Sequence, residues 1–486
     1  MDRKRLALLA AIMGSFVAGL DATVVNVALP TIERDLGGGL AGQQWVSNAY
    51  MLTLGSLILI GGSLGDVFGE RRVFSLGVGG FGVASLLCAV APTIEVLVGA
   101  RALQGVFGAL LTPSALAVII AAFPPAERGG AIGSWTAWTG ISFVVGPLAG
   151  GILVDHASWR WIFLVNLPFV AITLVLVAAA VEQRARDTAH PPVDWTGAVL
   201  CALGLAGPVF ALVRQPELGW GATSVWLPLV LGLAFFAAFL WRENRTPYPM
   251  LPLELFKRRN FAIGNIETLA MYGGLSITSF VLTLFLQEVA GYTAVQSGLA
   301  TVPITLIMFA LSKRMGALAD RFGPRRFMGF GPIIAGAGML LYQRVGEEAE
   351  YVSEVLPAVI VFALGLSMTV APLTATVLAD ADERNAGIAS GVNNAIARVA
   401  GLLGIALVGL LTGEAITVSG FHQVTLVSAA LVIAAGVLGL AGIADPRREV
   451  HCADCPGGAL AGVPPDAIPE VTLPRRPSAA PAGASR

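Results

Sequence analysis

The sequence is poor in charged residues and in cysteines. Charged side chains occupy 13% of its 486 positions, whereas soluble globular domains carry about 25%, so a water-soluble fold is excluded. The four cysteines offer no disulfide framework, because Cys88 and Cys201 fall within apolar runs, where a thiol behaves as a small hydrophobic group. Hydrophobic residues make up 56% of the chain, which points to an integral membrane protein.

Signatures of nucleotide-driven and zinc-dependent chemistry are also missing. The sequence contains neither a Walker phosphate-binding loop nor an HExxH motif, and no polar segment is large enough to form a nucleotide-binding domain. We therefore expect neither an enzyme nor an ATP-driven pump.

What the sequence does contain is a series of long apolar runs. A helix needs roughly 20 apolar residues to cross about 30 Å of hydrocarbon. Fourteen runs reach that length, so we predict an all-α integral membrane protein. The runs lie near residues 6–29, 44–64, 73–91, 96–122, 131–153, 161–181, 195–213, 223–241, 262–287, 298–315, 327–343, 354–379, 386–411 and 424–444.

The basic residues gather in alternate loops between these runs. One set of loops holds most of them, including the pairs at 71–72 and 325–326. The opposite loops hold only Arg34, Arg160, Arg214 and Arg344. Because Lys and Arg stay on the cytoplasmic side of a membrane, this pattern predicts a multi-pass protein of a bacterial-type cell membrane with both termini in the cytoplasm.

An internal repeat relates the two halves of the chain. The loop Gly62–Arg72 (GSLGDVFGERR) reappears as Gly316–Arg326 (GALADRFGPRR), and duplicated halves of a membrane protein usually enclose a transport path. We predict four segments from this pattern. They are a six-helix domain over residues 1–190, two inserted helices over 191–245, a second six-helix domain over 246–445 and a disordered cytoplasmic tail over 446–486.

The tail contains a small group of potential metal ligands. His451, Cys452 and Cys455 lie close together, but a structural zinc site needs four ligands and no second pair follows. We therefore expect no metal site there.

Four segments carry motifs that resemble those of a known family. They are Leu20–Pro30 in the first span, the repeated loop Gly62–Arg72, Arg101–Gly108 in the fourth span, and a set in the fifth span formed by Gly133, Gly146, Pro147, Gly150 and Gly151. Together they resemble the major facilitator superfamily, and within it the fourteen-span drug:proton antiporter branch, whose antiporter motif the fifth-span set matches. The resemblance implies two pseudo-symmetric six-helix domains plus two inserted helices, with alternating access to a site between the halves.

Charged residues inside spans are candidates for function, because an unpaired charge in hydrocarbon costs several kcal/mol. At 1.5 Å per residue, Asp21 lies about 24 Å from the cytoplasmic edge of its span and Arg101 about 10 Å from the outer edge of its own. The two side chains therefore reach a similar depth and can form an ion pair. The resemblance implies that this pair couples transport to protons; the alternative is a permanent structural pair.

A second polar set lies in the other half. Glu267 and Arg398 lie about 12 Å and 18 Å into their spans, and we predict that they too take part in proton coupling. Asn265, Asn393 and Asn394 have similar depth and are predicted to line the substrate cavity. The alternative is a hydrogen-bonded network that locks the two helices together.

The cavity is predicted to have a lining from the first half as well. We assign Asn26, Asn48, Tyr50 and Trp45 to it. For Trp45 the alternative is an anchor at the membrane interface, since aromatic residues gather there and this one is near the outer edge of its span.

The repeated loops are predicted to form cytoplasmic gates. The resemblance places Asp66 and Asp320 near helix N-termini of the opposite half, where a carboxylate is stabilised by about 0.3–1 kcal/mol, while Arg71 and Arg325 hold the loops down. Val67 stands where the family commonly has an arginine, which weakens the first gate. The alternative is that these charges only set the topology.

We therefore expect a secondary active transporter that exports amphipathic organic compounds, such as drugs or antibiotics, in exchange for protons. It would need no cofactor other than the proton as coupling ion, and would work as a monomer in the lipid bilayer without nucleic acid. The alternatives are a proton-coupled uptake carrier, a facilitator of a small metabolite, or a membrane sensor or scaffold that transports nothing.

Replacing Asp66 or Asp320 by asparagine should shift the protein toward its inward-open state, because each change removes a charge that holds the cytoplasmic side closed. We expect a shift of about 1 kcal/mol, roughly fivefold in the equilibrium, with the larger effect at Asp320. The accessibility of cytoplasmic-side cysteines, introduced into a background without the native ones, measures the shift. Equal accessibility in wild type and both variants would reduce the aspartates to local fold elements, and a larger effect at Asp66 would refute the asymmetry alone.

Overall fold

The structure is a computed structural model that describes residues 2–181, 193–379 and 386–445. Within these ranges the side chains of Asp66, Pro125, Ala126, Ala386 and Gly387 are not described. The predicted tail, with Cys452 and Cys455, lies outside the described residues.

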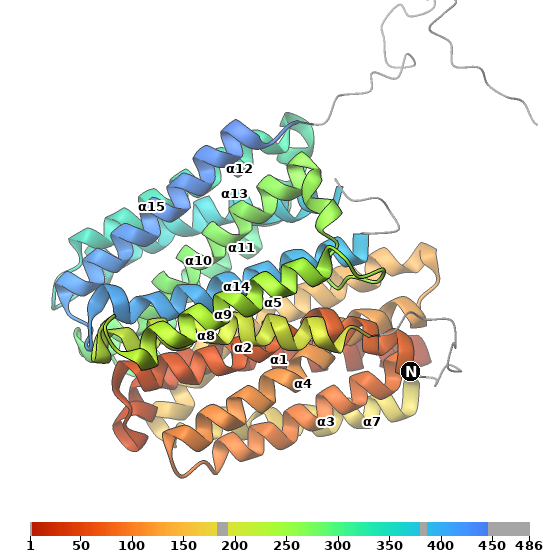
Figure 1. Cartoon of the computed structure of the whole chain (residues 1–486), viewed down its shortest axis with the longest axis horizontal. Coiled ribbons are helices and arrows are strands. Elements are labelled where there is room, and N and C mark those ends of the chain that lie inside the picture. Colours follow the sequence, from red (N-terminus) through yellow and green to blue (C-terminus); the bar gives the residue numbers. More distant parts are fainter. Residues whose placement is uncertain (1, 182–192, 380–385, 446–486) are drawn as a thin grey trace, which may run out of the picture. The chain divides into compact units, whose positions relative to one another are not determined.

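All regular secondary structure in the described part is helical (Figure 1). The first half contains α1 (Arg3–Leu36), α2 (Gly39–Phe68), α3 (Glu70–Ala89), α4 (Ile94–Ala122), α5 (Pro125–His156), α6 (Trp161–Leu164) and α7 (Asn166–Ala180). The middle contains α8 (Trp195–Leu218) and α9 (Thr223–Glu243). The second half contains η1 (Leu253–Lys257), α10 (Arg259–Glu288), α11 (Ala294–Phe322), α12 (Pro324–Leu341), η2 (Tyr342–Arg344), η3 (Tyr351–Val355), α13 (Leu356–Ala379), α14 (Ala386–Thr412) and α15 (Val418–Gly442).

The helices agree with the predicted spans. Thirteen helical segments in the described ranges are long and apolar enough to cross a membrane, with α6 and α7 together forming one of them. The remaining predicted span corresponds to α12, whose first turn contains Arg325 and Arg326. These charges at one end lower its mean apolarity, while its glycine-rich face packs between α13 and α15.

Neighbouring helices pack mainly within each half of the chain. In the first half α1 packs on α5 and α7, and α4 packs on α2 and α3; in the second half α12 packs on α13 and α15, and α10 packs on α14 and α15. The halves meet where α5 packs on α11 and α2 packs on α14. Residues 1–444 form one compact unit, so the domain boundaries near 190 and 246 stay a prediction.

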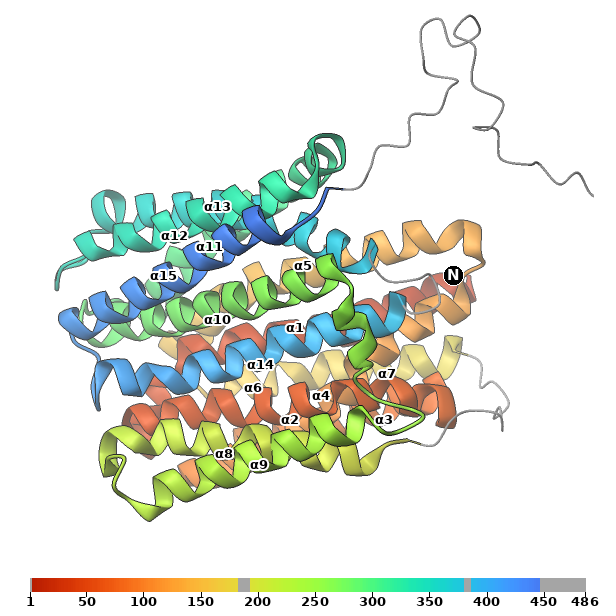
Figure 2. The same cartoon turned by 45° about the horizontal axis from the view of Figure 1, so that its top comes forward.

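The inserted helices α8 and α9 lie side by side, and α8 packs against both α2 and α14 where these two helices meet (Figure 2). Asp194 begins the pair: its carboxylate accepts from the Gly197 N–H at 2.8 Å and from Arg242 of α9 at 2.8–3.1 Å. Burial acts to raise the pKa of Asp194, but the hydrogen bonds from Arg242 and Gly197 outweigh it and hold the pKa below its usual value. The ion pair thus fixes the two helices to each other at one end.

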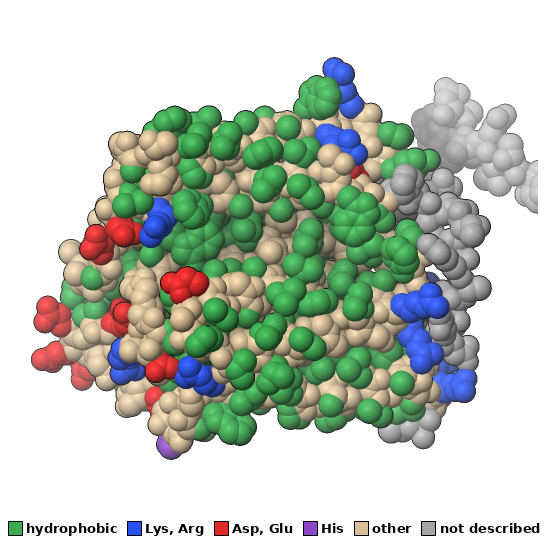
Figure 3. All heavy atoms as spheres, turned by 60° about the horizontal axis from the view of Figure 1, so that its bottom comes forward, with side chains coloured by type: hydrophobic (Ala, Val, Ile, Leu, Met, Phe, Trp, Pro, Cys, Tyr) green, Lys and Arg blue, Asp and Glu red, His purple; other side chains and the backbone are tan. Residues whose placement is uncertain are grey.

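Charge is segregated along the helices. Basic side chains gather at the end of the bundle where α1, α3, α10 and α12 begin, which we name the basic end. Acidic side chains gather at the opposite end, which we name the acidic end, where α1, α5 and α10 finish and η3 begins. On the face in Figure 3 a broad hydrophobic band separates the two ends, as expected for a protein that crosses a bilayer.

The polar contacts between the halves lie at the acidic end. Gln287 of α10 donates to the Val27 carbonyl of α1 at 3.0 Å, and Gln43 of α2 donates to Glu288 of α10 at 2.7 Å. Asp155 at the end of α5 accepts from the first two backbone N–H groups of α11 at 3.1 and 2.9 Å. A carboxylate is favourable at a helix N-terminus, so this contact ties α5 to α11.

Glycines allow the closest helix crossings of the second half. A Cβ added at Gly365 of α13 would lie 2.7 Å from the Ala335 Cα of α12, and one added at Gly338 of α12 would lie 2.7 Å from the Phe362 Cα of α13. Such approaches are the usual means of packing membrane helices tightly.

Gly365→Ala should therefore destabilise the protein by about 1–3 kcal/mol, because the added methyl group forces α12 and α13 apart. Gly130→Ala is the matched control, since a Cβ there meets nothing within 4 Å and alanine favours a helix. The midpoint of thermal unfolding in detergent is measured for both variants and for wild type. An unchanged midpoint for Gly365→Ala would show that the crossing relaxes without cost.

Candidate functional site

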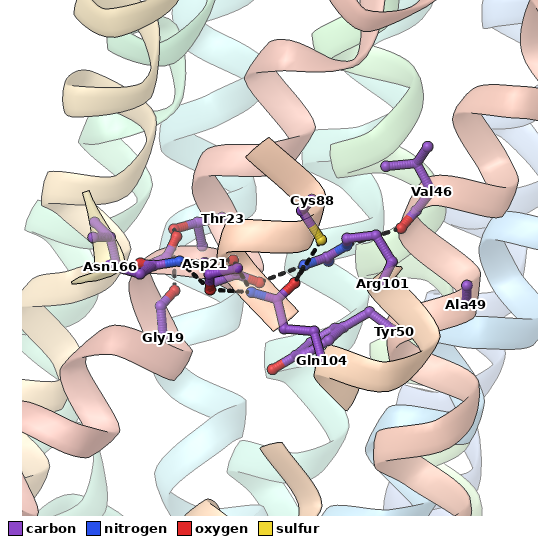
Figure 4. Close-up of polar contacts among 12 residues, drawn as sticks. Gly19, Asp21, Thr23, Val46, Ala49, Tyr50, Cys88, Arg101, Gln104 and Asn166 are labelled. Atoms are coloured by element: carbon purple, nitrogen blue, oxygen red, sulfur yellow. Dashed lines mark hydrogen bonds and ion pairs between the residues drawn. The ribbon is translucent and has the colours of Figure 1, made fainter. Parts of the chain in front are cut away.

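A buried ion pair joins α1 to α4 in the first half (Figure 4). The Arg101 Nη1 lies 2.6 Å from the Asp21 Oδ2, and neither side chain is more than 2% exposed. The similar depths of the two residues in the sequence allow this pair, and the structure contains it. In a medium of low dielectric such a pair persists only when its remaining hydrogen-bonding groups are also satisfied.

Neutral polar side chains provide most of the remaining hydrogen bonds of this pair. The second oxygen of Asp21 accepts from Gln104 Nε2 at 2.8 Å and from Asn166 Nδ2 at 3.1 Å. Both amides also donate to the Ser85 hydroxyl of α3, at 2.9 and 3.3 Å. Asp21 is therefore enclosed by side chains from α3, α4 and α7.

The guanidinium group of Arg101 has its own set of contacts. It donates to the Gln104 Oε1 at 2.6 Å and to the Val46 carbonyl of α2 at 3.1 Å. Its Cζ also lies 4.4 Å from the ring centroid of Tyr50, a cation–π contact. Through Arg101 the network reaches α2, the helix that packs on α14 of the second half.

This arrangement suits a switch of protonation. With Arg101 in place, the negative charge of Asp21 is matched by a cation and accepts hydrogen bonds from two amides. A shift of α4 or α2 that withdrew Arg101 would leave a buried carboxylate without its cation, and uptake of a proton would relieve that cost.

The polar residues of the second half form two separate groups. Asn393 of α14 donates to Asn265 and Thr268 of α10 at 3.1 and 2.8 Å, which joins these helices by a buried hydrogen-bond network. Glu267 faces another direction: it is fully buried next to Gly439 of α15, and neither of its carboxyl oxygens has a partner among the described residues. Glu267 and Arg398 are thus not brought together.

Residues predicted to line the cavity occupy different environments. Asn48 is fully buried, and its amide has no partner in the described part of the chain. Tyr50 is buried under Arg101, and Trp45 packs against Phe210 of the inserted pair, with ring centroids 5.9 Å apart. Asn26 is partly buried. Asn394 of α14, by contrast, is exposed.

The antiporter-motif glycines form contacts within and between the halves. A Cβ at Gly146 would overlap Thr23 of α1, and one at Gly150 would lie 2.7 Å from Val24. A Cβ at Gly151 would lie 2.6 Å from the Val295 Cα of α11. Of the other two motif residues, Gly133 has open space around it, and the carbonyl of Pro147 lies against Gly298 of α11. The motif therefore packs α5 against both α1 and α11.

The repeated loops are held by equivalent arginine contacts. Arg71 donates to the Ala178 carbonyl near the end of α7 at 3.3 Å, and Arg325 donates to the Leu440 carbonyl near the end of α15 at 2.5 Å. In each half a basic side chain thus meets the C-terminus of a helix, where its charge is favourable. Asp320 is exposed and has no hydrogen bond or ion pair with the described residues, whereas the Asp66 carboxylate lies outside the described part.

Three members of the Asp21 network were not selected from the sequence. Gln104 follows Arg101 by three positions, so it shares a helix face with it, and this spacing could have identified it. Asn166 and Ser85 gave no such signal, because small neutral polar residues are tolerated in spans without a functional role. Within the described ranges, no three His, Cys, Asp or Glu side chains are grouped so that they could hold a metal ion.

Comparison with known proteins identifies similar sequences over most of the chain. The model of the Major Facilitator Superfamily matches residues 11–405. The puromycin resistance protein pur8 of Streptomyces alboniger is 38% identical over 80% of this chain and 78% of its own. The tetracenomycin C resistance and export protein of Streptomyces glaucescens is 33% identical over 83% of this chain and 75% of its own. The multidrug resistance protein Stp of Mycobacterium tuberculosis is 36% identical over 84% of this chain and 76% of its own.

Solved structures with the same fold have diverged much further in sequence. A POT family transporter in complex with a thioalcohol-conjugated peptide has a TM-score of 0.70 at 14% identity, covering 90% of this chain and 95% of that one. A D-xylose–proton symporter has a TM-score of 0.64 at 14% identity, covering 90% and 97%. At this level of identity the likeness shows a shared fold.

Removing one member of the ion pair should cost more than removing both. Arg101→Gln alone leaves Asp21 buried without its cation and should lower the free energy of unfolding by about 3–5 kcal/mol. Combining it with Asp21→Asn removes the unmatched charge and should restore part of that loss. Thermal unfolding in detergent compares the variants, and additive losses in the double variant would show that the two charges do not interact.

Proposed function

Because the chain belongs to the major facilitator superfamily, we propose that it is a proton-coupled secondary transporter that exports amphipathic organic compounds, such as drugs or antibiotics. Three relatives, each matched over three quarters or more of its own length, are named for puromycin resistance, for tetracenomycin C resistance and export, and for multidrug resistance. Their names support export over the uptake carrier and the membrane sensor as alternatives.

The observation that carries proton coupling is the enclosed Asp21–Arg101 pair. Asp21 has hydrogen bonds from α4 and α7, and Arg101 has contacts on α2. A movement of α2 between the two states of the transporter therefore acts on Arg101 directly. We propose that Asp21 takes up a proton when Arg101 withdraws and releases it when Arg101 returns.

The charge segregation supports an orientation. We propose that the basic end faces the cytoplasm, as the positive-inside rule requires. The polar contacts between the halves, formed by Gln287, Gln43 and Asp155, would then close the outer side. The exposed Asp320 fits the same state, since its proposed contact would form only when the cytoplasmic side closes.

The protein would work in the bilayer as a monomer, with the proton as its only coupling ion. We keep Glu267 as a candidate second proton site, because its carboxyl group is buried and has no partner among the described residues. It belongs to the second half and lies apart from the Asp21 network.

Asp21→Asn should abolish transport driven by a pH gradient, because an amide cannot exchange the proton. Since the change also leaves Arg101 buried without its anion and lowers the free energy of unfolding, transport is compared at equal amounts of folded protein. Glu95→Gln is the matched control: this carboxylate lies on the helix of Arg101 but is exposed at the acidic end. Drug accumulation in proteoliposomes with an imposed pH gradient measures both variants. Full pH-driven transport by well-folded Asp21→Asn would contradict the role of Asp21.

A further inference from the structure

One embedded charge remains unexplained by the coupling network. Arg398 lies near the middle of α14, twelve residues after its first residue and about 18 Å along the helix axis. It is partly buried, and it forms no hydrogen bond or ion pair with any described residue. An unpaired guanidinium group at this depth is costly unless something in the transport cycle meets it.

The packing of α14 shows which way Arg398 faces. Gly391, Gly401 and Ile405 lie on the same face of α14 as Arg398, and they contact Leu59, Met51 and Gln44 of α2 respectively. Arg398 itself lies against α2, since a Cβ added at Gly55 would be 3.3 Å from the Arg398 Cβ. This face of α14 is therefore directed to the meeting line of the two halves.

The lipid side of that meeting line is covered. Leu402 and Ala406 of α14 pack in one hydrophobic cluster with Leu205 and Val209 of α8. Since α8 also packs on α2, α8 covers this meeting line from outside, and we infer that the exposed part of the Arg398 side chain faces the interior between the halves.

Within the described ranges, no carboxylate forms an ion pair with Arg398. Its charge acts on Tyr50 of α2 and on Tyr272 of α10, which lie close enough for electrostatic interaction. Of the two carboxylates embedded in the described spans, Asp21 is matched by Arg101 and Glu267 faces α15. Among the described residues, Arg398 is thus a positive charge in excess between the halves.

We propose that Arg398 is the substrate-binding group for an anionic substituent, so that the exported compounds are amphipathic molecules with a carboxylate or another acidic group. An arginine suits this task, because its planar donors bind a carboxylate in a bidentate manner. Tyr272 offers an aromatic surface for the apolar part of the same molecule. The inference rests on the proposed export function and specifies its substrate class.

The position of Tyr50 gives substrate binding a route to the proton site. Its ring packs under Arg101, 4.4 Å from the Cζ, and the charge of Arg398 acts on the same side chain. A substrate anion that neutralises Arg398 changes the field at Tyr50 and Arg101. Substrate binding in the second half thereby changes the electrostatic environment of the Asp21–Arg101 pair in the first half.

Three dansyl compounds that share one fluorescent scaffold test the proposal: dansylglycine is anionic, dansylglycinamide is neutral and dansylethylenediamine is cationic. Each is followed in proteoliposomes under a pH gradient, with protein-free liposomes as the reference. Wild type should transport the anion most rapidly. Arg398→Gln should slow the anion by about tenfold or more, as expected for loss of a charge-assisted hydrogen bond, and leave the neutral amide unchanged.

Two further variants separate binding from folding. Arg398→Lys keeps the charge but loses the bidentate donors, so it should transport the anion faster than Arg398→Gln and more slowly than wild type. Arg214→Gln, which removes an exposed arginine of α8, should change nothing. Faster transport of the cation than of the anion by wild type would overturn the anion site while leaving export intact. An equal loss for all three compounds in Arg398→Gln would assign a structural role to Arg398. If wild type moves none of them, the proposed function fails and this inference with it.

Discussion

A charge that is buried in the membrane must be matched, and this constraint organises the first half of the molecule. Asp21 and Arg101 lie 2.6 Å apart with essentially no exposure, and either charge alone would be strongly unfavourable there. Gln104 and Asn166 donate both to Asp21 and to Ser85, and Arg101 donates to the Val46 carbonyl. The network around one ion pair thus joins five helices, α1, α2, α3, α4 and α7. The same constraint makes the pair sensitive, because a displacement of Arg101 would leave the Asp21 carboxylate buried without its cation.

A transporter also requires that its two halves move relative to each other. The packing of α5 allows this motion, because α5 contacts both halves. Gly146 and Gly150 hold α5 against α1, whereas Gly151 brings its end close to α11 of the second half. The contacts with α1 lie within one half and the contacts with α11 lie between halves. A change at the acidic end, where Asp155 caps α11, can therefore move one half against the other without unpacking either.

Much of the fold could be predicted from the sequence, because hydrocarbon thickness dictates span length and basic residues mark one side of the membrane. Depth along a helix also follows from residue number, which is why the pairing of Asp21 with Arg101 could be expected. The direction in which a side chain points cannot be obtained from depth alone. Glu267 and Arg398 have similar depths but face α15 and α2, and Trp45 faces the inserted helices.

The central claim is that movement of the substrate and movement of protons are obligatorily linked. The most direct measurement is the internal pH of proteoliposomes, reported by trapped pyranine, when an amphipathic substrate is added without any imposed gradient. The account predicts that substrate movement in one direction drives protons in the other, at a rate proportional to the substrate flux. Protein-dependent substrate movement with no change in internal pH would contradict it.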